Sequence, residues 1–175
     1  SAEYAVVDRN AHSISFAYDA SFENFSGTKF HLRIGRTVRL IERETAAADL
    51  RIQIPASASI VAFESENTIT NTGSEAWKKD TGLLSLWVLG MFKPSDQTTV
   101  IAPFIKGDSE KIGPIVNDSY FGKVPADRIA VDEKNGAIFF RGDAKMRTKI
   151  GLSPHRSTPI VGSWDPTRSV LTIVK

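Results

Sequence analysis

An alternation of apolar and polar residues with a period of two is the feature that most constrains this fold. Between Phe30 and Arg43, apolar side chains occupy nearly every second position and the intervening positions are mostly polar or basic. Because successive side chains of a strand point to opposite faces, the pattern predicts a long, half-buried strand with a basic exposed face. Arg36 interrupts the apolar face beside Gly35, where we predict a bulge.

Similar patterns recur along the whole chain. Ser13–Asn24 and the turn at residues 24–27 predict an antiparallel hairpin with the long strand, and Asn135-Gly136 predicts a type I′ hairpin turn. Glu42–Leu50 is the one segment with helical character, and Ile105–Arg128 is predicted to be a long loop. Further strands are predicted around Val6 and Val7 and at Ile60–Asn71, Leu83–Phe92, Thr98–Phe104, Arg128–Val131, Ala137–Arg141, Thr158–Trp164 and Ser169–Val174.

About ten strands and at most one short helix predict an all-β fold, an antiparallel β-sandwich. The 175 residues suit a single domain over 1–175, because no linker, repeat or low-complexity tract divides them. The last predicted strand runs into the final residue, so we expect the chain to be the central part of a longer domain.

Composition excludes several classes of function. The 22 basic and 20 acidic residues give a net charge of +2 without a basic run, which argues against nucleic acid as a partner. The chain has no cysteine, so thiolate chemistry and Cys-based metal sites are excluded. No apolar run reaches the roughly 18 residues of a membrane-spanning helix, and no motif for a cofactor or metal ion is present.

Several motifs carry a likeness to a known superfamily. ENTITNTGSEAW, followed by GLLSLWVLGMF and TTVIAPF and preceded by FENFSGTKFHLRIGRTVRLIE, resembles the galactose mutarotase-like superfamily, in which an Asn-Thr-Gly turn links two long strands. The ordered set NTITNTGSEAW, LWVLGMFKPS, VNDSYFGKVPADR and RTKIGLSPHR is similar to an uncharacterised group of such proteins from Bacteroidetes-type bacteria. The likeness covers about Phe16 to Lys175. It implies part of a β-supersandwich in an exported or periplasmic protein.

The resemblance also implies which chemistry to look for. Enzymes of the superfamily epimerise sugars with a Glu and a His as general base and acid. The His is expected in a strand soon after the Asn71–Gly73 turn, but Leu83–Phe92 contains no histidine and has Trp87 in this region. The Glu is expected C-terminal to this chain. We therefore assign no catalytic residue, and the missing histidine argues against epimerase activity.

Six residues are candidates for a sugar site. Trp87 offers an aromatic face for a pyranose ring, although core packing is the alternative for any tryptophan. VNDSYFGK echoes the superfamily's histidine motif with Asp118 in the place of the histidine. The alternative for this stretch is an ordered loop held by the Asn117 and Asp118 side chains. The complete candidate set is Trp87, Asp118, Tyr120, Arg147, His155 and Arg156.

Loop position and neighbouring charges make His155 a ligand candidate. It lies in a Pro-containing loop next to Arg156, and loops on a rigid sandwich often carry binding residues. The alternative is a loop residue that bonds to backbone. Glu64 and Glu66 share one strand face and so resemble the carboxylate pair of a glycosidase, but pairing with Arg33 or Arg39 is the simpler explanation.

Three functions remain open on this basis. The first is a carbohydrate-binding or carbohydrate-metabolism-associated β-sandwich without epimerase chemistry. The second is an active sugar epimerase or a lyase- or hydrolase-associated enzyme that uses His155, Asp118 and Arg147. The third is a structural or interaction module with no sugar ligand. Strands missing from the sheet edges would also predict a homodimer that pairs through those edges.

Overall fold

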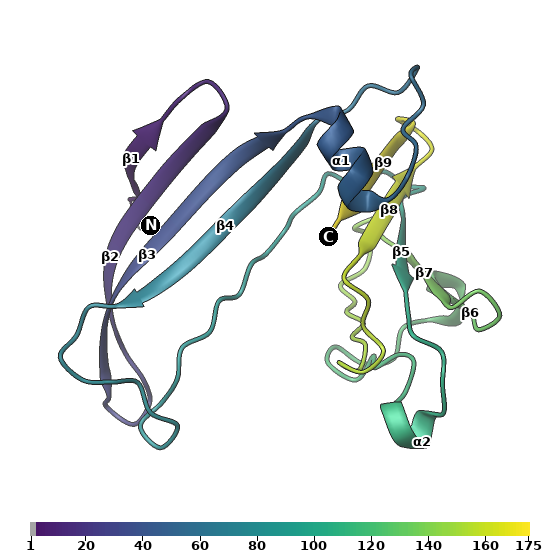
Figure 1. The fold of residues 1–175 in the computed structure, drawn as a ribbon. Coiled ribbons are helices and arrows are strands. Elements are labelled where there is room, and N and C mark those ends of the chain that lie inside the picture. Colours follow the sequence, from purple (N-terminus) through teal and green to yellow (C-terminus); the bar gives the residue numbers. More distant parts are fainter. Residues whose placement is uncertain (1–2) are drawn as a thin grey trace. The chain divides into compact units, whose positions relative to one another are not determined.

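The computed structural model describes residues 3–175 and confirms the all-β class (Figure 1). These residues form nine strands, two α-helices and one 3₁₀ turn, and the strands make two antiparallel sheets. One helix of seven or more residues is present among residues 3–175, in agreement with the single short helix that the sequence predicts. A four-residue helix and the 3₁₀ turn lie within the predicted long loop.

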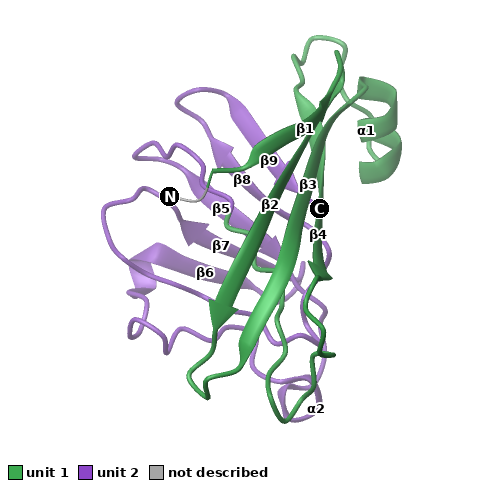
Figure 2. Ribbon diagram, turned by 90° about the vertical axis from the view of Figure 1, so that its left-hand side faces the viewer, with its two compact units in different colours: residues 1–89 green, residues 90–175 purple. Residues whose placement is uncertain are grey.

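The chain divides into two compact units, Ser1–Leu89 and Gly90–Lys175, which Figure 2 shows in green and purple. Each unit contains one of the two sheets. Two antiparallel sheets are the components that a β-sandwich requires. The single domain over residues 1–175 and the supersandwich implied by the resemblance stay predictions.

The sheet of the first unit has the strand order β1-β2-β3-β4. Its members are β1 (Ala5–Arg9), β2 (Ser13–Glu23), β3 (Lys29–Ile41) and β4 (Ala62–Asn71). The hairpin of β2 and β3 confirms the predicted pairing, with Phe22 opposite Phe30 near the turn. Helix α1 (Arg43–Leu50) follows β3 and confirms the predicted helical segment.

The predicted bulge at Gly35 is wrong. The register of β3 runs without interruption against both neighbours, so that Arg36 lies between Phe16 and Asn67 on the same sheet face as the apolar residues of β3. A Cβ atom on Gly35 would lie 2.6 Å from the Thr68 Oγ1 atom of the neighbouring strand. The glycine therefore permits a close approach between strands rather than an extra residue.

The two faces of this sheet differ as the alternation predicts. Phe30 and Leu32 are buried with Ala20, and the Trp77 ring meets Phe30 edge-on with centroids 6.2 Å apart. On the opposite face Arg39 pairs with two carboxylates, at 3.4 Å from Glu64 and 2.8 Å from Glu66. The simpler explanation for the two glutamates is therefore confirmed. The core packing considered as the alternative for tryptophan holds for Trp77.

The predicted strand at Leu83–Phe92 is wrong. None of these residues belongs to a strand, and seven of the large apolar side chains are exposed: Leu83, Leu86, Trp87, Val88, Leu89, Met91 and Phe92. Leu84 alone packs against the buried cluster of Phe30 and Leu32. Alternation identifies a segment that can form a strand, but a strand also needs a partner for its backbone groups, and no pairing is formed here.

The sheet of the second unit has the strand order β6-β7-β5-β8-β9. Its members are β5 (Thr99–Pro103), β6 (Ile129–Asp132), β7 (Ala137–Arg141), β8 (Val161–Asp165) and β9 (Val170–Val174). Ile138 in β7 is fully buried. Helix α2 (Ser109–Ile112) and the 3₁₀ turn (Ala126–Arg128) lie in the connection between β5 and β6.

The hairpin of β6 and β7 is confirmed, but its turn is not type I′. Asp132 pairs with Ala137, which leaves a four-residue connection. Gly136 has a φ of +68°, whereas Asn135 is outside the positive-φ region that a type I′ turn requires at both central positions. The Asp132 carboxylate instead accepts hydrogen bonds from the backbone N–H and the side-chain amide of Asn135, which lower the pKa of Asp132.

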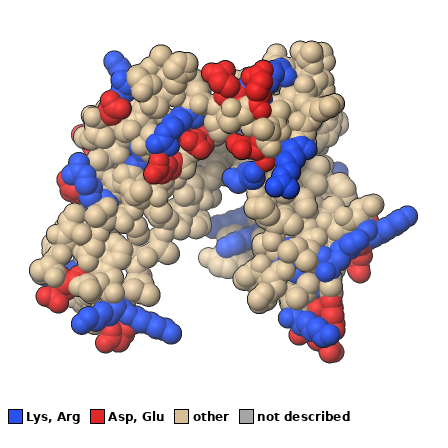
Figure 3. Space-filling view, in the orientation of Figure 1, with Lys and Arg blue, Asp and Glu red and all other residues tan. Residues whose placement is uncertain are grey.

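Charges of both signs are interspersed on the face drawn in Figure 3. No helix within residues 3–175 is long and apolar enough to span a membrane. The outer strands of the two sheets are β1, β4, β6 and β9. Pairing of two copies through such edges stays a prediction, which light scattering on the purified protein would check.

Candidate functional site

Two loops of the second unit meet through a short backbone bridge. Asn117 and Gly151 exchange N–H···O hydrogen bonds, each 2.8 Å long, in an isolated antiparallel pair. The bridge fixes the loop that carries Tyr120 and Phe121 beside the segment that carries Arg147 and Lys149. The two rings lie 26 or more positions from the two cations in the sequence, so local patterns alone cannot predict their contact.

Four side chains from the two loops form what we call the Tyr120 cluster: Tyr120, Phe121, Arg147 and Lys149. The two rings are perpendicular, with centroids 4.7 Å apart. The Arg147 Cζ atom lies 4.5 Å from the centroid of Phe121, and the Lys149 Nζ atom lies 4.0 Å from the centroid of Tyr120. Both distances are within the range of favourable cation–π contacts. The cluster therefore joins two aromatic rings and two cations.

The Tyr120 cluster is accessible to a ligand. Tyr120 is 70% exposed and Phe121 is 44% exposed, although aromatic rings of this size are ordinarily well buried. Arg147 and Lys149 are also exposed. Two of the six predicted site residues, Tyr120 and Arg147, thus belong to one surface cluster, whereas Phe121 and Lys149 are not among the residues that the sequence predicts. Phe121 is adjacent to Tyr120 and Lys149 is two positions from Arg147, so nearness in sequence to a predicted candidate was the signal that could have found them.

Asp118 and Asn117 shape the loop that presents these rings. The Asp118 carboxylate accepts a 3.1 Å hydrogen bond from the backbone N–H of Val124, whose side chain is buried. The Asn117 side-chain oxygen accepts hydrogen bonds from the backbone and the hydroxyl of Ser119. These contacts match the alternative of an ordered loop held by its own side chains. A ligand role for Asp118 stays a prediction.

Arg156 organises a different set of loops from inside the second unit. It is 1% exposed, and its guanidinium donates to the carbonyl oxygens of Gly113, Ile105 and Gly107 at 2.7, 3.0 and 3.0 Å. A fourth hydrogen bond, 3.0 Å long, reaches the hydroxyl of Ser109. Because four of its five N–H donors are used in this way, Arg156 holds the region around α2 in place.

His155 lies next to Arg156 in sequence but points to a different environment. It is exposed and makes no hydrogen bond or ion pair with another residue of the described range 3–175. No contact with another described residue supports a ligand role for His155, and that role stays a prediction.

Trp87 belongs to the first unit, whereas the other five candidates belong to the second. It is 81% exposed and lines a groove of about 770 Å³ over one face of the sheet of β2, β3 and β4. Most of the lining is apolar and includes Phe16, while Arg36 and Asn67 add polar groups. The volume is within the range of small-molecule sites, which makes this groove a second candidate location.

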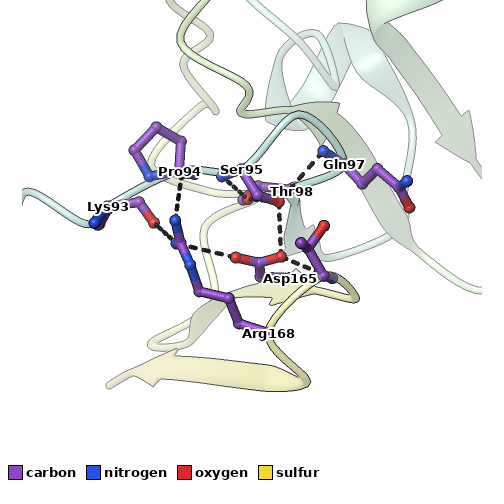
Figure 4. Close-up of polar contacts among 8 residues, drawn as sticks. Lys93, Pro94, Ser95, Gln97, Thr98, Asp165 and Arg168 are labelled. Carbon is purple, nitrogen blue, oxygen red and sulfur yellow. Dashed lines mark hydrogen bonds and ion pairs between the residues drawn. The ribbon is translucent and has the colours of Figure 1, made fainter.

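A second cavity, of about 500 Å³, lies in the second unit beside Asp165. Figure 4 shows that Asp165, at the end of β8, binds groups from two directions. Its carboxylate accepts a 2.7 Å hydrogen bond from the Ser95 hydroxyl and a 3.2 Å contact from Arg168. The Ser95 hydrogen bond is the main cause of the lowered pKa of Asp165.

The Asp165 and Arg168 side chains at this cavity are engaged with the protein itself. Arg168 also donates to the carbonyl oxygens of Lys93 and Pro94, at 3.1 and 3.2 Å, and so connects the β8–β9 hairpin to the segment before β5 (Figure 4). The Asp165 and Arg168 side chains therefore anchor loops. Neither of them is free to bind a ligand in the 500 Å³ cavity.

The second unit also contains a buried ion pair. Arg128, the last residue of the 3₁₀ turn, forms a two-point contact with the carboxylate of Asp143, whose side chain is 3% exposed. Asp143 also accepts a 3.0 Å hydrogen bond from the backbone N–H of Lys145. The hydrogen bonds from Arg128 are the largest cause that lowers the pKa of Asp143 to about 2. Sequence spacing of 15 residues gave no signal for this pair.

The geometry favours binding over proton transfer at the Tyr120 cluster. Its rings offer apolar faces and its cations offer N–H donors, whereas its nearest sequence carboxylate, Asp118, is engaged by the loop. Among residues 3–175, no group of three or more acidic or histidine side chains is arranged to hold a metal ion.

Comparison with known proteins gives one match. The model of DUF6786, described as a family of unknown function, matches residues 1–175. Neither the curated proteins nor the solved structures yield a match. Since the family model covers the entire chain, with its two antiparallel sheets and the Tyr120 cluster between β5 and β8, the chain belongs to the DUF6786 family of unknown function.

Proposed function

We propose that this chain is a carbohydrate-binding domain and that the Tyr120 cluster contacts the sugar. The observation that carries the proposal is the exposed Tyr120–Phe121 pair with two cations held on its rings. A pyranose presents C–H groups on its faces and hydroxyls at its edge. Exposed aromatic faces suit the first, and Arg and Lys N–H donors beside the rings suit the second.

The framework of the cluster also supports binding. The Asn117–Gly151 bridge and the Asp118 hydrogen bond hold the loop in one conformation before a ligand arrives. A preordered loop loses less conformational entropy on binding than a mobile one, which favours affinity. The resemblance to the galactose mutarotase-like superfamily is consistent with a sugar ligand, and we include a supersandwich of that type in the proposal.

A glycan array with the intact protein tests the proposal. We expect binding to a subset of glycans, and we expect Tyr120→Ala to abolish it because the substitution removes the exposed ring. Phe25→Ala is the matched control, since Phe25 is a fully exposed aromatic residue in the β2–β3 turn of the other unit. Equal binding by wild type and Tyr120→Ala would remove the cluster from the proposal, and no binding by folded wild type would refute it.

Polarimetry distinguishes binding from catalysis. We expect sugar mutarotation at the spontaneous rate in the presence of the protein, because the histidine of the superfamily's enzymes is missing after the Asn71–Gly73 turn. A rate above this background that His155→Ala removes would favour the enzyme alternative instead.

A further inference from the structure

Several basic side chains of the described residues have an internal acceptor. Arg39 pairs with Glu64 and Glu66, and Arg33, Arg128, Lys145 and Arg168 each contact an aspartate. Arg43, Lys106 and Arg156 donate to backbone carbonyls. Arg147 and Lys149 differ from this set, because within residues 3–175 neither donates a hydrogen bond or forms an ion pair.

Aromatic rings hold these two cations in place without using their donors. A cation over a ring face is attracted by the π electrons, while its N–H groups stay free to bind an acceptor. Arg147 lies over Phe121 and Lys149 over Tyr120, on rings whose centroids are only 4.7 Å apart. The cluster therefore holds two neighbouring positive charges with unused donors at an exposed surface.

No carboxylate of the adjoining loops neutralises this pair. Asp118 accepts from the Val124 N–H, and Asp143 is buried against Arg128. Asp96, which lies near the same segment, is paired with Lys145 at 3.1 Å. The positive charge of the Tyr120 cluster is thus uncompensated within the described chain, and an oxyanion of a ligand would supply the missing partner.

We infer that the saccharide bound at the Tyr120 cluster is acidic, and that Arg147 and Lys149 bind its carboxylate or sulfate group while Tyr120 contacts the sugar ring. This inference rests on the proposed carbohydrate-binding function and specifies its ligand class. Two cations on one aromatic pair match a single oxyanion of a sugar residue, whereas a nucleic acid backbone requires a longer basic surface than this balanced chain offers.

The test compares three β-linked galactan-type oligosaccharides of equal length, which are neutral, carboxylated or sulfated, by calorimetry with the intact protein. We expect at least about tenfold tighter binding of one or both acidic forms than of the neutral form, with affinity falling as salt rises from low to physiological concentration. The carboxylated and sulfated arms show which oxyanion the site accepts.

Substitutions then assign the effect to the two cations. We expect Arg147→Gln and Lys149→Gln each to remove most of the preference for the acidic form and to leave thermal stability unchanged. Lys145→Gln is the matched control, because Lys145 is an exposed cation of the same segment that is paired with Asp96. A preference that survives both substitutions, or that Lys145→Gln abolishes equally, would overturn the assignment.

A change in the ligand gives a second test that does not depend on variant folding. Methyl esterification of the carboxylated oligosaccharide removes its charge and should lower its affinity to that of the neutral form. Equal affinity of neutral, acidic and esterified forms would overturn the inference while leaving carbohydrate binding intact. Binding of none of the saccharides would refute the proposed function itself, so the two failures are distinguishable.

Discussion

Arg156 and Arg147 are nine positions apart in the second unit, yet their surroundings differ in every respect. Arg156 is 1% exposed and donates four hydrogen bonds to the loops around α2. Arg147 is exposed, lies over the Phe121 ring and donates to no residue of the described chain. A buried guanidinium whose donors are all but one hydrogen-bonded stabilises the fold. An exposed guanidinium that lies over an aromatic ring keeps its donors available to a ligand.

The largest expected effect comes from Arg156. Arg156→Ala should lower the free energy of unfolding by about 3–5 kcal/mol, because it removes four hydrogen bonds to the loops around α2 and leaves a cavity in place of a buried side chain. Chemical denaturation followed by tryptophan fluorescence measures the change. Arg156→Lys should fall in between, since one ammonium group cannot reach all four acceptors. Near-wild-type stability of Arg156→Ala would contradict its structural role.

The buried Arg128–Asp143 pair should make stability depend on acid. In the unfolded chain Asp143 takes up a proton near its ordinary pKa of about 3.9, whereas in the fold its pKa is about 2. The unfolded state therefore binds the proton first, and the stabilisation present above pH 4 is lost as the pH falls toward 2. Melting temperatures of wild type and Asp143→Asn between pH 6 and 2 measure it. We expect the wild type's advantage to disappear across this interval, and a constant difference would contradict the assignment.

A smaller effect is expected for the exposed pair of Arg33 and Asp19. Their side chains are 52% and 70% exposed, and the contact distance is 3.2 Å. Solvent and salt screen such pairs, so Asp19→Asn should change the free energy of unfolding by less than about 1 kcal/mol. Denaturation at low and high salt measures it, and a loss comparable to that of Arg156→Ala would show that exposure does not separate the two classes of arginine.

The smallest effect on stability is expected for Arg147 itself. Arg147→Ala should leave the free energy of unfolding within about 0.5 kcal/mol of wild type, because the residue is exposed and has no hydrogen-bond partner to orphan. Denaturation under the same conditions as for Arg156→Ala gives a direct comparison. A large loss of stability would mean that the ring contact with Phe121 holds the loop together, and the contrast with Arg156 would fail.

Much of the fold follows from the sequence because strands need only local alternation to be recognised. Ser13–Asn24, the long strand from Phe30 and the hairpin around Asn135-Gly136 were predicted with nearly correct bounds. Leu83–Phe92 was not, since it has the alternation of a strand but no partner. Partnership is a property of the assembled sheet, and the local pattern carries no information about it.

The candidate site was predictable in kind but incomplete in its members. VNDSYFGK and the basic residues near His155 drew attention to the two loops that the Asn117–Gly151 bridge joins. Phe121 and Lys149 are not predicted by the sequence, because what marks them as site residues is their cation–π contacts between the two loops. Arg156 was selected for its charge, which a sequence displays, while its burial is visible in the fold alone.

The sequence by itself determined that this chain forms antiparallel strands, where most of them begin and end, and which side chains share a face. These properties depend on neighbours within a few residues, through backbone geometry and the alternation of side chains. Tertiary structure decided which Arg and Lys side chains donate hydrogen bonds within the protein and which keep their donors free. That outcome depends on acceptors and rings contributed by distant segments, as with Arg156 at the carbonyls of Ile105 and Gly113 and Arg147 at the ring of Phe121.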